Sequence, residues 1–264
     1  WHQAKHPLLF LSLRGKREVV PLNIEFDPVD RMLLVSGPNA GGKSVCLKTV
    51  GLLQYMVQCG LLVPLSDRSR VGTFRDIFLD IGDQQSIEND LSTYSSHLRN
   101  MSVFLSSATE GSMVLMDELG SGTDPVEGAA LGGAILEALT ERRSLSVATT
   151  HLGALKELAT EVPGVVNASL QFDSVALAPT YRLIKGIPGR SYGLSIARRL
   201  SLPEEILSRA EARLPTGERD VNALLSELES REARLTELEK EAAEIAEDVR
   251  ERARRVAERE TSVR

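Results

Sequence analysis

The stretch GPNAGGKS occupies residues 37–44 and has the spacing G-x-x-x-x-G-K-S of a phosphate-binding loop, or P-loop. It follows an apolar run over 31–36, which predicts a buried strand, and precedes a run over 45–53, which suits a helix. Glycines let the backbone wrap so that its N–H groups point at phosphate oxygens, and the start of the helix adds a partial positive charge. Because a strand precedes the loop and a helix follows it, we predict a phosphate site rather than a glycine-rich turn without chemical function.

The P-loop predicts a nucleotide with magnesium as the ligand. Lys43 is long enough to reach the β- and γ-phosphates, and the hydroxyl of Ser44 can ligate Mg²⁺. We therefore expect ATP, or its product ADP, bound with Mg²⁺. The predicted nucleotide-binding residues of this stretch are Gly37, Pro38, Asn39, Ala40, Gly41, Gly42, Lys43, Ser44 and Val45.

A second motif, SMVLMDE over residues 112–118, ends an apolar run with two carboxylates. The run predicts a buried strand, and ligands of open α/β sheets bind at the carboxyl ends of strands. Asp117 can then hold Mg²⁺ through water as the partner of Ser44, and Glu118 can orient or activate a water at the γ-phosphate. Two carboxylates could simply end a strand, but a P-loop about seventy residues upstream favours the catalytic interpretation.

Three further polar segments are compatible with a nucleotide site but are less specific signals than the P-loop and the two carboxylates. His151 ends a predicted strand that begins at Leu145, where an imidazole can hydrogen-bond the γ-phosphate and sense its presence. A lone histidine is more often structural, but the end of a strand favours a functional role. The polar loop at 82–86 suits a Mg²⁺-bound water or a solvated loop equally well. The hydroxyl residues within 89–98 open a predicted helix and suit anion binding as well as capping.

Length and composition limit the class of protein to which the chain can belong. The 264 residues suffice for one large domain with an appendage, and the first residue is Trp, so we expect part of a longer protein. No apolar run reaches the length of a membrane span and no secretory signal opens the chain. Cys46 and Cys59 lack metal-type spacing, so we expect core packing and a reducing cytoplasm. The net charge of −6 argues against a strongly basic nucleic-acid surface.

The remaining pattern predicts an α/β fold. A helix rich in Ala and Gly, suited to close packing, is expected over 127–139. Further strands are expected at 8–13, 18–26, 168–172 and 180–184, with a strand pair within 71–81.

The C-terminal part predicts two helical regions. Residues 194–200 and 204–214 indicate a helix, a turn and a helix, which could read DNA or pack a dimer. Residues 216–264 include 14 acidic and 10 basic residues, and their apolar residues recur every seven positions. This pattern fits either a weak coiled coil or a solvated single helix. The recurring residues are Leu228, Leu235, Ala242, Val249 and Val256 in one row, and Leu224, Leu238 and Ile245 in the other, which Arg231, Arg252 and Arg259 interrupt.

Four segments together resemble the ATPase domain of the MutS family, which belongs to the ABC-type ATPases: GPNAGGKS, LMDELGSGTDP, ATTH and SYGLSIARRLSLPEEILSRA. The segment DPVEGAAL resembles the bacterial recombination-suppressor branch of the family more than the mismatch-recognition branch. The resemblance implies a three-layer ABC-type P-loop domain with a mixed sheet over 1–215. A charged helical segment over 216–264 would lead to a nuclease region outside this chain.

The resemblance also gives roles to particular residues. Ser92, in the family's signature loop, would meet the γ-phosphate held by a partner subunit, and Asp124 would lie in the loop that crosses the dimer. Tyr181 would contact adenine, whereas Val19 and Val20 stand where mismatch-type members stack an aromatic side chain on the base. The same resemblance agrees with the phosphate, magnesium and Walker B roles expected for Lys43, Ser44, Asp117 and Glu118, and makes His151 the switch histidine.

The expected function is ATP hydrolysis in a head-to-tail homodimer with two shared sites, which ATP and Mg²⁺ close and hydrolysis opens. The output would be a clamp change on branched or recombining DNA, made by regions outside this chain. One alternative is an ATPase that acts on stalled ribosomes. Another is a DNA-tethering ATPase of the SMC type, which would insert a coiled coil between the P-loop and Asp117, where this chain has only about seventy residues.

Overall fold

The computed structural model describes residues 1–38, 41–82, 93–173, 178–190 and 192–213, together with isolated helical positions between 224 and 249. The chain divides into two compact units, Trp1–Leu214 and Pro215–Arg264. Among the described residues, no helix has the length and apolar character that crossing a membrane requires.

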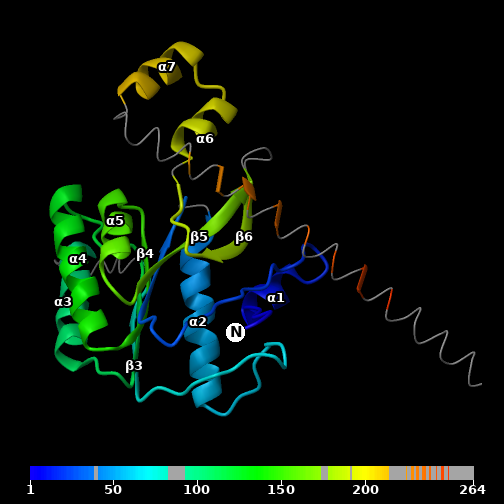
Figure 1. Ribbon diagram of the computed structural model, residues 1–264, viewed down its shortest axis with the longest axis vertical. Helices are drawn as coiled ribbons and strands as arrows, with labels where there is room; N and C mark the ends of the chain where they lie inside the picture. The colour runs from blue at the N-terminus through cyan, green and yellow to red at the C-terminus, as the bar shows by residue number, and fades with distance from the viewer. Residues whose placement is uncertain are drawn as a thin grey trace, which may run out of the picture. The chain divides into compact units, whose positions relative to one another are not determined.

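A six-stranded mixed sheet forms the centre of the first unit, in the order β2-β3-β4-β1-β5-β6 (Figure 1). Neighbouring strands from β2 to β5 pair in parallel, and β6 runs antiparallel to β5. Every residue of β1 and β3 is buried, which explains why both appear in the sequence as continuous apolar runs. The strands are β1 (Met32–Ser36), β2 (Asp76–Asp80), β3 (Ser112–Met116), β4 (Leu145–Thr150), β5 (Val165–Asp173) and β6 (Ala178–Lys185).

Helices cover both faces of the sheet, so the fold has three layers, as predicted. In Figure 1, α3, α4 and α5 lie on one side of the strands and α2 lies on the other. Leu136, Leu139 and Leu155 help to fill the first interface, and Leu47 and Leu53 of α2 help to fill the second. The four helices are α2 (Lys43–Gln58), α3 (Thr93–Ser107), α4 (Pro125–Glu141) and α5 (Gly153–Glu161).

Residues 8–13 form a helix, so the strand predicted there is wrong. The helix α1 (Pro7–Leu13) begins after His6, whose Nδ1 accepts a hydrogen bond from the N–H of Leu9 at 3.3 Å. Pro7 takes the first position, where its missing N–H breaks no helical bond. A short apolar run suits a helix or a strand, and here the local capping decides.

The strands predicted at 18–26 and 71–81 are also partly wrong. The first segment forms only an isolated antiparallel bridge, between Leu22 and Ala4, and the second holds the single strand β2. Leu22 and Ile24 are nonetheless buried, in the same cluster as Leu47 of α2. Alternating apolar residues indicate that one face of a segment is buried. Here the segment buries that face against a helix, without pairing as a strand in a sheet.

The two cysteines have different environments. Cys46 lies inside α2 and is buried, as predicted, and burial raises the pKa of its thiol to about 12. Cys59 is exposed, because it follows the last residue of that helix, so the prediction of core packing is wrong for Cys59.

Helices α6 (Gly193–Arg199) and α7 (Glu204–Arg213) confirm the predicted helix, turn and helix. The guanidinium of Arg198 donates to Glu204 at 3.0 Å and to Glu211 at 2.9 Å, and Arg209 pairs with Glu205. Two of the four arginines that suggested a DNA-reading surface thus pair with carboxylates of α7 at exposed positions.

In the second unit, every described position is helical and exposed. Arg231 pairs with Glu227 one turn earlier. The exposed large apolar residues of this unit are Leu224, Leu228, Leu235, Leu238, Ile245 and Val249.

Candidate functional site

Parallel strands bring the predicted phosphate and Walker B residues to one edge of the sheet. The P-loop follows β1, the two carboxylates follow β3, and His151 follows β4. Ser36 pairs with Thr150, and Met116 with Ala148, so the three strand ends are neighbours. This is the edge at which ligands bind in open α/β sheets.

Two glycines turn the chain from β1 into α2. Gly37 has a φ of +138°, and Gly42, the N-cap residue of α2, has a φ of +91°. Side chains strain such backbones, so glycine is required at both positions. A Cβ on Gly42 would also lie 3.0 Å from the ring of Tyr181, which therefore packs against the loop. Asn39 and Ala40 lie outside the described residues.

Lys43 is a buried cation at the start of α2. Its side chain is 3% exposed, and its Nζ donates a hydrogen bond to the carbonyl of Gly37 at 2.7 Å. Burial lowers the pKa of Lys43, and the negative charges of Glu118 and Asp117 act in the opposite direction. The ammonium is thus close enough to both carboxylates for their charges to affect it. Ser44 and Val45, the next residues of α2, are half-buried and exposed.

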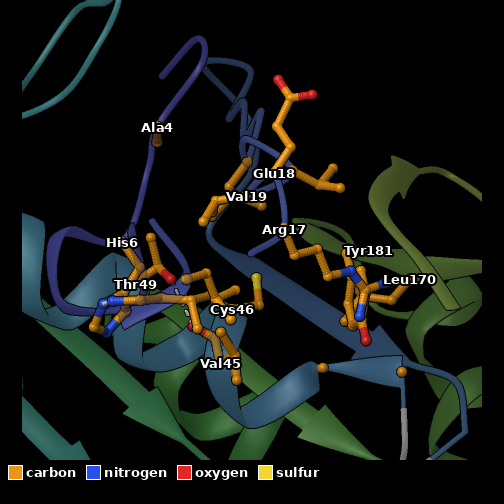
Figure 2. A pocket seen from close by; sticks show the side chains of 16 residues that line it. Ala4, His6, Arg17, Glu18, Val19, Val45, Cys46, Thr49, Leu170 and Tyr181 are labelled. Atoms are coloured by element: carbon orange, nitrogen blue, oxygen red, sulfur yellow. Dashed lines mark hydrogen bonds between the residues drawn. The ribbon is translucent and has the colours of Figure 1, made fainter. Parts of the chain in front are cut away.

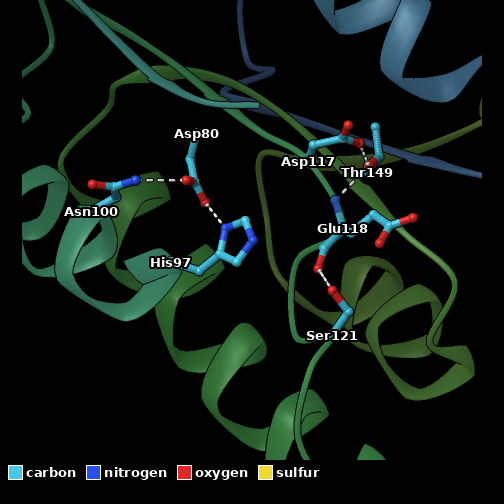
Figure 3. Close-up of polar contacts among 7 residues, drawn as sticks. All are labelled: Asp80, His97, Asn100, Asp117, Glu118, Ser121 and Thr149. Carbon is cyan, nitrogen blue, oxygen red and sulfur yellow. Dashed lines mark hydrogen bonds and ion pairs between the residues drawn. The ribbon is translucent and has the colours of Figure 1, made fainter. Parts of the chain in front are cut away.

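Thr149 of β4 joins the two carboxylate residues (Figure 3). Its hydroxyl donates to Oδ1 of Asp117 at 2.5 Å and accepts from the backbone N–H of Glu118 at 2.8 Å. Asp117 is buried, so this hydrogen bond fixes one of its oxygens. Thr149 was not predicted as a site residue, although it stands two residues before His151.

Glu118 combines an exposed side chain with an unusual backbone. Its φ is +52°, a conformation that side chains rarely adopt, and its carbonyl accepts from the hydroxyl of Ser121 at 2.5 Å. Gly120 packs so closely on the next helix that a Cβ would lie 2.6 Å from the carbonyl oxygen of Gly128. Strained backbones of this kind cluster at functional sites, where the surrounding structure holds them.

The other predicted site residues differ in their surroundings. His151 is exposed just beyond β4. Asp124, expected in a loop that crosses a dimer, caps α4 in this chain, because its Oδ1 accepts from the N–H groups of Val126 at 2.9 Å and Glu127 at 3.3 Å. Ser92 lies outside the described residues.

The donor set fits a magnesium ion that is held partly by phosphate. Ser44 and Asp117 offer the hard oxygen atoms that Mg²⁺ prefers. Within the described part of the chain, no group of three or more His, Cys, Asp or Glu side chains could form an all-protein metal site. Mg²⁺ usually binds nucleotides through one or two protein oxygens, the phosphates and water, and the residues here fit that mode.

A pocket of about 810 Å³, part of it open to solvent, lies beside the P-loop (Figure 2). Its floor is the first part of α2, and its walls come from the N-terminal segment and from β5 and β6. The guanidinium of Arg17 lies over the ring of Tyr181, 5.5 Å from its centroid. Val19 and Val20 line the pocket with aliphatic side chains, and His6, Arg17 and Tyr181 line it with planar groups.

Asp80, the last residue of β2, is a second buried carboxylate beside the Walker B pair. Its backbone carbonyl accepts the N–H of Asp117 at 2.8 Å, and its side chain is 3% exposed. Asp80 was not predicted as a site residue. The segment DIFLD nonetheless repeats the pattern of an apolar strand that ends in a carboxylate, and this pattern is the signal that could have pointed to it.

A family model described as MutS domain V matches residues 33–216. Three curated relatives are named Endonuclease MutS2. The protein of Gemmatimonas aurantiaca is 57% identical over 261 residues, which are 99% of this chain and 32% of the relative. Those of Thermomicrobium roseum and Thermus thermophilus are each 50% identical, over 86% and 87% of this chain and 28% and 30% of their own lengths. The chain therefore spans less than a third of these relatives.

Proposed function

Because the chain belongs to the MutS domain V family of ATPases, we propose that it hydrolyses Mg·ATP at the carboxyl edge of its sheet. One observation carries the proposal: Lys43 buries an ammonium at a P-loop, at the same edge of the sheet as Asp117 and Glu118. The β- and γ-phosphates would take the place of the Gly37 carbonyl as the partner of Lys43. A triphosphate suits a buried cation better than a carbonyl does, because charge-assisted hydrogen bonds are about twice as strong as neutral ones.

Ser44 and Asp117 would hold the magnesium ion, the serine directly and the aspartate through water. When bound, Mg²⁺ neutralises charge on the phosphate oxygens during transfer. The hydrogen bond from Thr149 to Asp117 supports this role, because it leaves the second carboxylate oxygen of Asp117 for the metal's water and fixes its direction.

Glu118 would orient the attacking water and accept its proton. Its side chain is exposed, whereas Asp117 is buried, so the two carboxylates suit different tasks. The Thr149 hydroxyl and Ser121 hold the backbone of Glu118 in its left-handed conformation, which sets the direction of its Cα–Cβ bond. His151, at the end of the neighbouring strand, would contact the γ-phosphate and report its presence.

The adenine base would lie in the pocket beside the P-loop. Tyr181 packs on Gly42, and the guanidinium of Arg17 lies over its ring, so these two planar groups offer a purine a flat surface within a largely aliphatic pocket. The Val19 and Val20 side chains would contact the base without stacking.

We infer that two chains complete each site. The P-loop surrounds one side of a nucleotide, and Ser92 of a second chain would meet the γ-phosphate from the other side. Asp124 would lie in the loop that faces the second chain. Closing a site around ATP excludes water and strengthens its electrostatic interactions, so hydrolysis depends on the dimer.

The dimer would open and close a clamp on branched or recombining DNA, through parts of the longer protein, in the cytoplasm of a bacterial cell. Residues 216–264 would be a charged helical segment that leads from the ATPase, residues 1–215, to a further C-terminal region of the longer protein. Nucleic acid recovered with the full-length protein tests the target: enrichment of branched DNA supports the proposal, and enrichment of ribosomal RNA contradicts it.

The substitution Glu118→Gln tests the hydrolytic role. The variant should bind ATP normally but hydrolyse it about 10²–10⁴ times more slowly, because the carboxylate acts on water. Glu137→Gln, at an exposed position of α4, is the matched control and should have normal turnover. Normal turnover in both variants would assign the base to another residue.

A further inference from the structure

Asp80 holds the start of α3 against the end of the edge strand β2 (Figure 3). One carboxylate oxygen, Oδ2, lies 2.5 Å from Nδ1 of His97, and the other, Oδ1, accepts from Nδ2 of Asn100 at 2.7 Å. His97 and Asn100 are three residues apart, so both project from the same face of α3. A buried carboxylate is costly unless hydrogen-bonded, and here each oxygen has its own donor.

We call the two side-chain contacts of Asp80, to His97 and to Asn100, the fork. The backbone of Asp80 connects this fork to the catalytic carboxylates. Asp80 pairs with Met116 in the sheet, and its carbonyl accepts the N–H of Asp117 at 2.8 Å. His97, Asp80, Asp117 and Glu118 line one pocket between α3 and the end of β3. A single residue therefore contacts α3 through its side chain and Asp117 through its main chain.

The hydrophobic contacts of α3 lie further along the helix. Met101 and Phe104 are buried in the core, and the ring of Phe104 lies 5.4 Å from that of Phe78. These contacts attach the middle of α3 to the sheet. The polar fork fixes its first two turns, which are the part nearest to the Walker B carboxylates.

We propose that Asp80 is a positioning residue for hydrolysis, acting through His97 and Asn100. The two side-chain bonds of Asp80 and its main-chain bond to Asp117 hold the start of α3 and the backbone of Asp117 in one arrangement, so that Asp117 and Glu118 keep their position at the γ-phosphate. The P-loop, which binds the nucleotide, lies on another strand and does not depend on the fork. This inference rests on the proposed ATPase function.

Asp80→Asn in the full-length protein tests the proposal. The amide nearly preserves the shape but replaces one acceptor oxygen by a donor, so that one hydrogen bond of the fork is lost. Turnover (kcat) should fall about tenfold to a hundredfold, the range expected for a lost hydrogen bond to a charged group, whereas the Kd for ATP should stay within about threefold. Asp76→Asn, at the opposite end of the same strand, is the matched control and should leave both quantities unchanged.

A pair of substitutions at His97 separates positioning from folding. His97→Gln can keep an N–H donor for Asp80, whereas His97→Leu has none. Glutamine should restore most of the turnover that leucine removes, at equal ATP affinity. Equal turnover in these two variants would overturn the proposal, even if Asp80→Asn fails to fold.

Three other results would contradict the proposal, and they can be told apart. Normal turnover of Asp80→Asn, beside a slow Glu118→Gln variant, would leave the ATPase in place and remove the role of Asp80. Absence of hydrolysis in the unsubstituted protein would remove the proposed function itself. A loss of ATP affinity in Asp80→Asn as large as its loss of turnover would assign the fork to binding and also overturn the inference.

Discussion

Lys43 shows how a single residue can prepare a site for an anion. Its ammonium is buried and donates a hydrogen bond to the carbonyl of Gly37, and burial lowers the pKa of Lys43, although the charges of Glu118 and Asp117 act in the opposite direction. Removing a cation from water is unfavourable, and a neutral carbonyl compensates less than an anionic partner does. A bound triphosphate would therefore improve the surroundings of a charge that the fold already keeps in place.

Lys43→Ala should weaken ATP binding about tenfold to a hundredfold, because hydrogen bonds to charged groups contribute about 1.5–3 kcal/mol. Lys48→Ala, on an exposed position of the same helix, is the control and should bind ATP normally. Titration with a fluorescent ATP analogue measures both affinities. Unchanged affinity in a folded Lys43→Ala protein would rule out the assigned phosphate site.

At the scale of elements, close packing shapes the loop between β3 and α4. Gly120 has a φ of +82°, and a Cβ there would lie 2.6 Å from the carbonyl oxygen of Gly128. The loop that carries Glu118 is thereby pressed onto the first turns of α4. The backbone conformation of Glu118 depends on this contact as well as on the hydrogen bonds of its N–H and carbonyl.

Gly120→Ala should destabilise the protein more than Gly186→Ala. Gly186 has a similar φ of +88°, but a Cβ there meets nothing within 4 Å. Both variants should lose about 1–2 kcal/mol from the left-handed backbone, and Gly120→Ala a further 1–3 kcal/mol or so from overpacking. Urea midpoints compare the two. Equal midpoints would contradict the close contact with α4.

The sequence predicted those elements best whose residues are buried on both sides. The apolar runs of β1 and β3 correspond to real strands, and the motifs at their ends pointed to Lys43, Asp117 and Glu118. The run at 8–13 was misleading, because its helix is set by a proline and a histidine cap. Arg17 becomes visible as a pocket residue only when the N-terminal segment folds beside the P-loop, and the contact of Asp80 with Asp117 depends on the pairing of β2 with β3.

At the scale of the whole molecule, our central claim is that each ATP site is shared by two chains. In this proposal Lys43 and Glu118 would belong to one half of a site, and Ser92 of the second chain would belong to the other half. A monomer would leave the γ-phosphate half solvated, so specific activity should rise with protein concentration. Activity that is independent of concentration would speak against a shared site.

The most direct measurement mixes Ser92→Arg with Glu118→Gln and records ATP hydrolysis. Each variant alone should be inactive, but the mixed dimer has one site built from intact halves. Mixing should restore up to about a quarter of the unsubstituted activity if pairing is random and the two sites act independently.

Mixing Lys43→Ala with Glu118→Gln is the control, because both changes lie in the same half and every site keeps one defect. Rescue in the first mixture and none in the second is the result that we predict. No rescue in the first mixture, with both variants folded and able to dimerise, would contradict the shared site.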